Sequence, residues 1–235
     1  LMALIFTIII VNVFGSNEGM SFITGEGDMP DPDKRASLFP RRGRYLPPYG
    51  EGRAHNIESR LVPPGGGDPI EDDGVSGELQ IRGHWVLDSY FGQEKPATTW
   101  DGWFDTGDMA VMEEDGFIKI VSRTKEMIIT GGFNVYPAEV EEVLTDHPQI
   151  STAGVVGLEQ EDGSEEVVAA VVLEEGVSES DFDAEEAREW SREALTRYKV
   201  PRQFFVVDEL PADMIGKIRR REVKDLVESM IEDKK

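Results

Sequence analysis

Cysteine is absent from the 235 residues, and basic residues are few, with 24 Lys and Arg against 47 Asp and Glu. The first absence excludes disulfide bonds, thiolate metal sites and a cysteine nucleophile. The second gives a formal net charge of −23 at pH 7, and a strongly negative surface repels nucleic-acid phosphates. We therefore expect no nucleic-acid partner, and any anionic ligand must be held by a few locally placed Lys and Arg side chains.

Histidines and long apolar runs are also scarce. The three histidines, His55, His84 and His147, are scattered, so surface or hydrogen-bonded roles explain them better than a metal site. The apolar opening, residues 1–14, is shorter than the roughly 18 residues of a membrane span. It also contains Asn12 and lacks a basic start and a cleavage site. Its β-branched residues favour a buried strand, so we expect a cytoplasmic protein without a transmembrane segment, in a chain that begins within a domain.

The first half of the chain has the pattern of a loop-rich β region. Gly, Pro and charged residues dominate residues 24–76 and separate short extended pieces such as Ile57–Val62. A strand follows from Gly77, and two strand-like runs are then joined by an Asp-Gly turn at Asp115–Gly116. At 39% hydrophobic residues, the chain can form more than one core.

The second half has the pattern of a compact α+β module. We place the boundary so that the domains are residues 1–121 and 122–235. The module is expected to contain a short strand and a Gly-Gly loop, then a helix from Pro137 to Pro148. Two longer strands, an acidic helix at about 183–198, a strand and a final helix follow.

Five sequence blocks occur in a fixed order along the chain. They are GSNEG at 15–19, GWFDTGD at 102–108, SRTKEMIITGGFNVYPAEVEEVL at 122–144, RYKVP at 197–201 and GKIRRRE at 216–222. Together they resemble the signature blocks of the AMP-forming acyl-CoA synthetase family, from Asn12 onward. The resemblance implies an α+β protein: the end of a large AMP-binding domain followed by a small, mobile C-terminal lid.

The resemblance also implies a ligase reaction. ATP with Mg²⁺ activates a small carboxylic acid, here expected to be a fatty acid, to an acyl-adenylate, and the thiol of coenzyme A then displaces AMP. Asp108 matches the carboxylate that accepts hydrogen bonds from both ribose hydroxyls, although a lone Asp after Gly is usually a turn residue. Arg123 matches an arginine that contacts the nucleotide. Phe14 and Gly15 match an aromatic and a glycine beside adenine, with core packing as the alternative for Phe14.

Three further residues match positions around the phosphates. Glu18 corresponds to the acid associated with Mg²⁺, a hard oxygen ligand for a hard ion. Asn17 departs from the usual Thr before it but still carries a donor for a phosphate oxygen. Lys217 matches the lysine that bridges the carboxylate and α-phosphate during adenylation, where the alternative is a surface lysine near a helix start.

The Gly-Gly loop and its surroundings match the thiol-transfer part of the family. Gly131 and Gly132 lack Cβ atoms, so pantetheine can pass close to the backbone, and the form that ends in Asn134 is typical of CoA ligases. Lys125 occupies the hinge position about which the lid turns. A basic cluster, Arg219–Arg221 with Lys224, either holds CoA phosphates or forms an ion-paired helix face.

Two other functions stay open. The enzyme either loads a carrier-protein thiol in place of CoA, or the chain is a truncated, non-catalytic remnant. No Ser/Thr/Gly-rich phosphate-binding loop ending in Lys precedes GSNEG. We therefore expect the 235 residues to be inactive by themselves.

Overall fold

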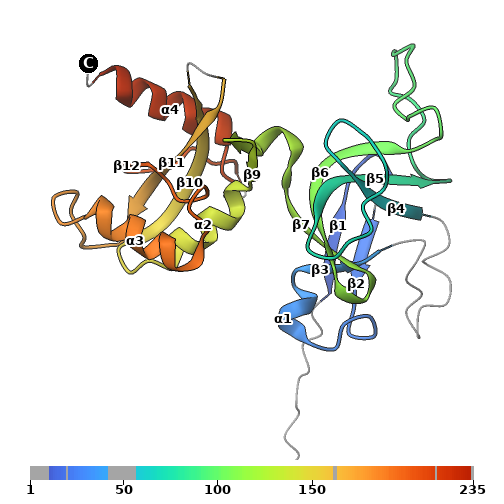
Figure 1. Cartoon of the computed structure of the whole chain (residues 1–235), viewed down its shortest axis with the longest axis horizontal. Helices are drawn as coiled ribbons and strands as arrows, with labels where there is room; N and C mark the ends of the chain where they lie inside the picture. The colour runs from blue at the N-terminus through green and yellow to red at the C-terminus, as the bar shows by residue number, and fades with distance from the viewer. Residues whose placement is uncertain (1–10, 20, 42–56, 161–162, 215, 234–235) are drawn as a thin grey trace, which may run out of the picture. The chain divides into compact units, whose positions relative to one another are not determined.

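The chain forms two compact units, Leu1–Thr124 and Lys125–Lys235, in a computed structural model (Figure 1). The structure describes residues 11–19, 21–41, 57–160, 163–214 and 216–233. The boundary expected from the sequence, between Val121 and Ser122, lies within the last strand of the first unit, and the two units divide a few residues later, after Thr124.

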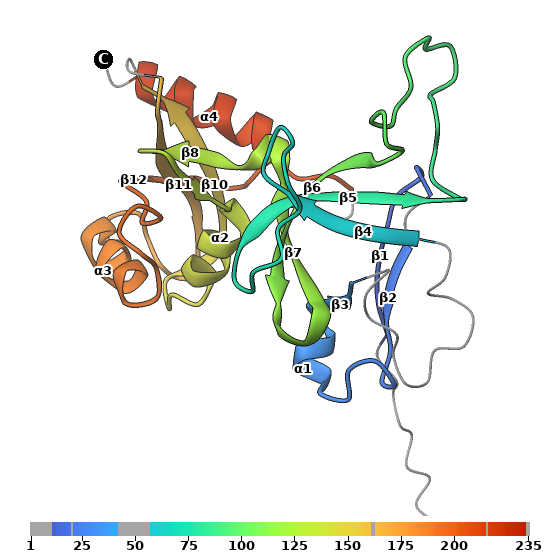
Figure 2. The same cartoon turned by 45° about the vertical axis from the view of Figure 1, so that its right-hand side comes forward.

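An antiparallel five-stranded sheet in the order β3-β7-β6-β5-β4 forms the centre of the first unit (Figure 2). A separate hairpin, β1-β2, and a one-turn helix precede it. The elements are β1 (Asn12–Gly15), β2 (Ser21–Thr24), α1 (Pro32–Arg35), β3 (Leu38–Pro40), β4 (Ile57–Val62), β5 (Ser76–Gly83), β6 (Phe104–Glu113) and β7 (Phe117–Arg123).

Several local predictions for this unit are confirmed. β4 and β5 lie where extended pieces were expected, and β6 and β7 form the predicted hairpin. In its turn, Asp115 takes the left-handed conformation, with φ of 59°, which a short polar side chain tolerates. Most of the predicted strand in residues 1–14 lies outside the described residues.

The first unit buries the inward-facing side chains of its strands. Leu79 and Ile81 alternate along β5 and are fully buried, as the period of two in a strand requires. Each such side chain contributes roughly 1.5–3 kcal/mol on leaving water. The surrounding core includes Phe22, Phe39, Leu61, Phe104, Met112 and Ile118.

The second unit is a three-layer module around the sheet β10-β11-β12, in which β10 and β11 are antiparallel and β11 and β12 parallel. Helix α4 lies on one face of this sheet, and α2 and α3 lie on the other (Figures 1 and 2). The elements are β8 (Ile128–Thr130), β9 (Phe133–Val135), α2 (Pro137–Thr145), β10 (Ile150–Glu159), β11 (Glu165–Leu173), α3 (Ala184–Ala194), β12 (Gln203–Val206) and α4 (Arg220–Glu232).

Both faces of this sheet are buried, which its sequence reflects. Val155 belongs to the core under α2 and α3, and its neighbour Val156 belongs to the core under α4. Val167 and Val168 divide between the two cores in the same way. A strand covered on both faces is apolar at consecutive positions rather than alternating. Among the described residues, no helix is long and apolar enough to cross a membrane.

Two elements of the second unit differ from the sequence prediction. The acidic helix ends at Ala194 rather than near Tyr198, because Leu195 is extended, with φ −112° and ψ 146°. A short strand after the Gly-Gly loop, β9, was not predicted. Its three residues are too few for periodicity to show, and its pairing with β8 identifies it.

His147 closes the C-terminal end of α2 as a buried histidine. Its Nδ1 accepts the backbone N–H of Gln149 at 3.2 Å, and its ring meets Trp190 edge to face at 5.3 Å. Burial lowers the pKa of His147 below 6.5, and the nearby carboxylate of Glu186 partly offsets this. The histidine thus matches the expected hydrogen-bonded role.

The lowered pKa of His147 predicts a loss of stability in mild acid. Between the unfolded pKa of about 6.5 and the lower folded value, the unfolded chain binds more protons, so the free energy of unfolding falls with falling pH. His147→Asn keeps an acceptor for Gln149 but does not titrate. Urea unfolding at pH 7.5 and 5.5 should show a larger drop for the wild type than for this variant, whereas equal drops would contradict the assignment.

Candidate functional site

Asp108 and Arg123 form an ion pair across the β6-β7 hairpin. They face each other in the strand register, and Arg123 Nη1 lies 3.0 Å from Asp108 Oδ1. A register irregularity follows immediately, between Met109 and Ala110. Such bulges re-aim side chains near functional sites. Two residues that the sequence assigned to the nucleotide are therefore brought together by the fold.

Hydrogen bonds from the neighbouring Thr106 fix this pair in place. The Thr106 hydroxyl accepts the backbone N–H of Asp108 at 3.1 Å and donates to the carbonyl of Leu79 at 2.9 Å. Arg123 Nη1 also donates to the Thr106 carbonyl at 3.2 Å. The Asp108 side chain is only 5% exposed, whereas that of Arg123 is 50% exposed. Arg123 is thus the accessible partner, and Asp108 is the fixed one.

Glu18 lies in the turn after β1, close enough to Arg123 to respond to its charge. The pKa of Glu18 is lowered, first by hydrogen bonding to the Ser16 side chain, then by its own backbone N–H, by Tyr90 and by the charge of Arg123. Desolvation opposes these effects but does not reverse them. Glu18 is therefore ionised at neutral pH, as a magnesium-associated carboxylate must be.

Tyr90 is a site residue that the sequence did not reveal. Its hydroxyl donates to Glu18 Oε1 at 3.2 Å, and its pKa is raised by desolvation and by the hydrogen bond and negative charge of Glu18. The two residues are 72 positions apart, and no motif marks the segment around Tyr90. Only the tertiary structure brings them together.

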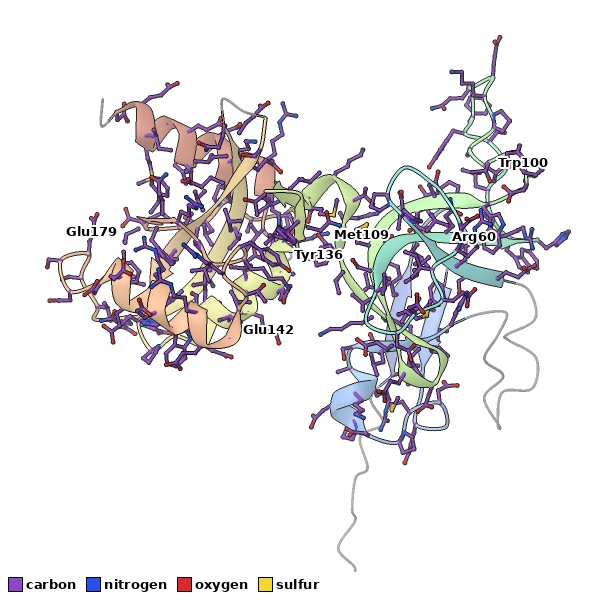
Figure 3. The ribbon with its side chains drawn as sticks, viewed as in Figure 1. Arg60, Trp100, Met109, Tyr136, Glu142 and Glu179 are labelled. Atoms are coloured by element: carbon purple, nitrogen blue, oxygen red, sulfur yellow. The ribbon has the colours of Figure 1, made fainter. Side chains whose placement is uncertain are left out.

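The connection that carries Tyr90 runs from β5 to β6 and includes exposed aromatic side chains. Trp100, labelled in Figure 3, is one of them and is 98% exposed. The connection returns to the sheet at Trp103, which has two guanidinium groups over its ring. Those of Arg60, labelled in Figure 3, and Arg82 lie 4.2 and 4.6 Å from the ring centroid. These cation–π contacts hold the end of the connection on the sheet.

Gly19 is required by the same turn for two independent reasons. Its φ is +102°, and a Cβ at this position would lie 1.8 Å from the carbonyl oxygen of Trp85. The backbone of Leu87 also donates to the Glu18 carbonyl at 2.9 Å. The turn that presents Glu18 is thus pressed against the segment that leads to Tyr90.

Gly19→Ala should therefore destabilise the first unit by roughly 2–4 kcal/mol, from steric overlap and left-handed backbone strain. Gly25→Ala is the matched control, because its Cβ would meet only Asp28 Oδ2 at 3.7 Å. Urea unfolding followed by tryptophan fluorescence measures both. Equal stability of the two variants would show that the turn is not held against Trp85.

The other adenine and phosphate candidates lie beside this cluster in the sequence, but they take no central part in it. Phe14 is half-buried and meets Phe39 at a ring distance of 5.9 Å. It packs at the edge of the core, and its role beside adenine stays a prediction. Gly15 and Asn17 are exposed. Within the described residues, no group of three or more His, Asp or Glu side chains forms a metal site, so Glu18 provides a single carboxylate.

Gly131 and Gly132 form the tight turn between β8 and β9. Both have positive φ, of 56° and 82°, and no atom lies within 4 Å of a Cβ at either position. Their backbone conformation therefore requires glycine, and the space beside them is open. Asn134 pairs with Ile129 in the β8-β9 ladder, and the next residue after the turn, Phe133, stacks on Tyr198 at 4.6 Å.

A groove of about 740 Å³ opens beside this turn. Four arginines line it, which the sequence prediction did not single out. One of them, Arg188, is held by the carbonyls of Pro201 and Arg202 and by Glu185. The groove residues are Thr130, Gly131, Phe133, Val167, Glu185, Arg188, Arg192, Arg197, Tyr198, Val200, Pro201 and Arg202.

Lys217 lies exposed on a closed loop just before α4. The backbone of Asp213 donates to the Lys217 carbonyl at 2.9 Å, and the Asp213 carboxylate accepts the Lys217 N–H at 2.9 Å. A β-bridge between Ala212 and Ile218 closes the loop below. Asp213 and Lys217 are therefore linked by two hydrogen bonds, although these residues lie outside regular structure.

The remaining candidates lie at the start of the second unit and of α4. Lys125 is the first residue of the second unit and sits in a 3₁₀ turn, Thr124–Glu126. The residues of the basic cluster have different surroundings. Arg219 forms an ion pair with Glu222 at 3.0 Å near the surface, and the mostly covered Arg220 forms one with Glu141 at 2.6 Å. Part of this cluster is thus the ion-paired surface that the sequence left as an alternative.

Comparison with known proteins decides the family. Residues 139–217 match the AMP-binding enzyme C-terminal domain. The chain belongs to the AMP-binding, adenylate-forming enzyme family. A 2-succinylbenzoate–CoA ligase from Bacillus cereus is 39% identical over 169 residues, which cover 68% of this chain and 34% of that protein. The mitochondrial medium-chain acyl-CoA ligase ACSF2 from Mus musculus is 36% identical over 191 residues, covering 79% and 29%.

A solved relative supports the same family. The o-succinylbenzoate CoA synthetase from Bacillus subtilis, in complex with the acyl-adenylate intermediate OSB-AMP, matches with a TM-score of 0.70 and 31% identity. The match covers 91% of this chain and 40% of that one. The two ligases named above are matched over about a third of their own length, so this chain spans about a third of the curated relatives. Its α+β fold is that of the C-terminal part of adenylate-forming enzymes.

Proposed function

We propose that this chain is the C-terminal part of an enzyme that activates a carboxylic acid with ATP and transfers the acyl group to CoA. The observation that carries the proposal is the Asp108–Arg123 ion pair, with the ionised Glu18 in the same unit. Together they combine a buried carboxylate, an accessible guanidinium and an ionised carboxylate. The buried carboxylate suits a ribose, the guanidinium suits the nucleotide oxygens, and the ionised carboxylate suits a phosphate-bound cation.

In the proposed nucleotide site, Asp108 accepts hydrogen bonds from the ribose hydroxyls. A carboxylate has about four lone-pair sites, so one such group can accept hydrogen bonds from both hydroxyls of a diol. Because the Asp108 side chain is almost buried, Arg123 must turn aside or share the carboxylate as the ribose approaches. Phe14 and Gly15 flank the adenine and Asn17 faces a phosphate in this proposal, which rests on the family resemblance for these three residues.

Lys217 is proposed to neutralise charge on the carboxylate and the α-phosphate while the acyl-adenylate forms. Residues 122–235 carry 27 acidic and 14 basic residues, and Lys217 is an exposed cation just before the basic cluster at the start of α4. A charge aimed at a developing negative charge lowers the barrier because it is already in place. Turning about Lys125 would bring this lysine to the site and withdraw it again.

Coenzyme A is the proposed acyl acceptor. The open space beside Gly131 and Gly132 admits a narrow pantetheine arm, and Asn134 fixes the strand that follows. The neighbouring groove supplies arginines in a strongly acidic protein. Guanidinium groups suit the phosphate oxygens of CoA, and Arg188 and Arg192 are also paired with Glu185 in this groove.

The acid is proposed to be a carboxylate with a largely apolar body. One relative is named for 2-succinylbenzoate and another for medium-chain acids. The fatty acid expected from the sequence is therefore one candidate substrate class, and an aromatic acid is the other.

Both acid classes would be tested with a full-length enzyme that carries this chain, with ATP, Mg²⁺ and either CoA or a phosphopantetheinylated carrier. AMP release with a CoA thioester is the expected result.

Other outcomes of this assay separate the alternatives. A thioester formed only on the carrier would replace CoA with a carrier thiol. No AMP with any acid would favour the non-catalytic remnant. The 235-residue chain assayed alone should give no turnover, and robust turnover there would contradict the assignment of the first unit as part of a larger domain.

A further inference from the structure

Arg220 is a largely covered cation at the first residue of α4, three positions after Lys217. Its side chain is 16% exposed, and its Nη2 lies 2.6 Å from Glu141 Oε2 on α2. Its Nε lies 3.6 Å from Glu126 Oε2. One guanidinium thus joins the start of α4, the middle of α2 and the residue after Lys125.

Glu141 ties this arrangement to the central sheet. Its second oxygen, Oε1, accepts the backbone N–H of Val155 on β10 at 2.8 Å. Burial raises the pKa of Glu141, and the charge of Arg220 opposes that rise. A buried carboxylate needs a paired cation to stay ionised, so the two side chains depend on each other.

The loop that carries Lys217 leads directly into Arg220. The Arg219 N–H donates to the Pro211 carbonyl at 2.9 Å, which closes the base of the loop. Ile218 packs against the core beneath α4. The end of the loop is therefore held by the Arg219 hydrogen bond, by apolar packing at Ile218 and by the ion pairs of Arg220. Of these, Arg220 is the one that forms an ion pair with the residue beside Lys125.

We propose that Arg220 is a positioning residue, which through Glu126 and Glu141 holds the Lys217 loop at a fixed place relative to the segment at Lys125. This inference rests on the proposed function, since it assigns Arg220 to the delivery of Lys217. Turning at Lys125 then moves Lys217 as part of a rigid body. Without the Glu126–Arg220–Glu141 triad the loop moves independently, and the lysine reaches the phosphate less accurately.

Half-reactions in a full-length enzyme that carries this chain test the proposal. Arg220→Met should slow adenylate formation about 10- to 100-fold, the range expected for a misplaced catalytic group. The KM for ATP and the attack of CoA on supplied acyl-adenylate should stay nearly unchanged. In the 235-residue chain, the amide hydrogens of Gly216 and Lys217 should exchange faster in this variant.

Two further variants separate positioning from stability. The double variant Arg220→Met/Glu141→Gln removes both charges of this ion pair, and the new Gln side chain can still accept the N–H of Val155. Its thermal midpoint should therefore recover, while adenylate formation stays slow. Glu126→Gln removes only the partner beside Lys125 and should slow adenylation at near-normal stability. Recovery of the rate together with the midpoint, or a normal rate in Arg220→Met, would overturn the inference.

Lys217→Ala, measured alongside, separates the inference from the proposed function. If Lys217→Ala also leaves adenylation unchanged, the assigned role of the lysine is wrong and the positioning role of Arg220 falls with it, whereas the proposed function fails only if the wild-type enzyme forms no adenylate. If Lys217→Ala is slow and both Arg220→Met and Glu126→Gln are normal, only the positioning role is wrong.

Discussion

Lys217→Ala is expected to slow adenylate formation by roughly 10²–10³-fold in a full-length enzyme, the range for removing one preorganised electrostatic group. Attack of CoA on supplied acyl-adenylate should change much less, because in the proposed scheme the lysine contacts the reacting phosphate only during adenylation. Pyrophosphate exchange measures the first half-reaction, and thioester formation from synthetic acyl-adenylate measures the second.

Lys119→Ala is the charge-matched control for this prediction. Lys119 is exposed on β7, and it lies outside every proposed contact, so its removal should leave both half-reactions unchanged. Equal losses in both half-reactions for Lys217→Ala would contradict a role confined to adenylation. A similar loss for Lys119→Ala would point to the overall charge of the protein instead.

Gly132→Leu is expected to have the opposite effect. No atom lies within 4 Å of a Cβ at Gly132, so the leucine side chain would fill the space proposed for pantetheine. Thioester formation should fall by about two orders of magnitude, as for other misplaced reacting groups, while pyrophosphate exchange continues. Quenched assays of acyl-AMP and thioester in the same reaction would show acyl-AMP accumulating.

Gly132→Ala controls for the backbone in this experiment. Both variants carry a Cβ at a residue whose φ is +82°, so their backbones have similar left-handed strain. Only leucine fills the open space, so alanine should retain most of the thioester rate. If the two variants are equally slow, backbone strain rather than blocked access explains the loss.

Local signals were sufficient to predict most of the secondary structure. The Asp115–Gly116 turn, the Pro137 helix start and the apolar runs of β10 and β11 are each set by a few neighbouring residues. The end of α3 was missed because Leu195 would suit a helix, and its extended conformation depends on burial in the core of the second unit. Tertiary packing overrode propensity there.

The candidate site was predicted only where a motif marks it. Asp108 and Arg123 lie in such motifs, and the structure pairs them. Tyr90 at Glu18 and the clash that requires Gly19 were missed, because each involves segments far apart in the sequence. The ion pairs of Arg220 with Glu126 and Glu141 were also missed, because Arg220 lies far from both residues in the sequence.

The division after Thr124 places the proposed nucleotide contacts and the proposed acyl-transfer residues in separate stretches of the sequence. Asp108, Arg123 and Glu18 all precede the division, whereas Lys217 and the Gly131–Gly132 turn all follow it. In the proposed scheme, a genetic crossover at this point would exchange the acyl-acceptor side together with Lys217 and keep the ribose contact of Asp108. Recombination at one short turn would then change the acceptor without rebuilding the ribose site.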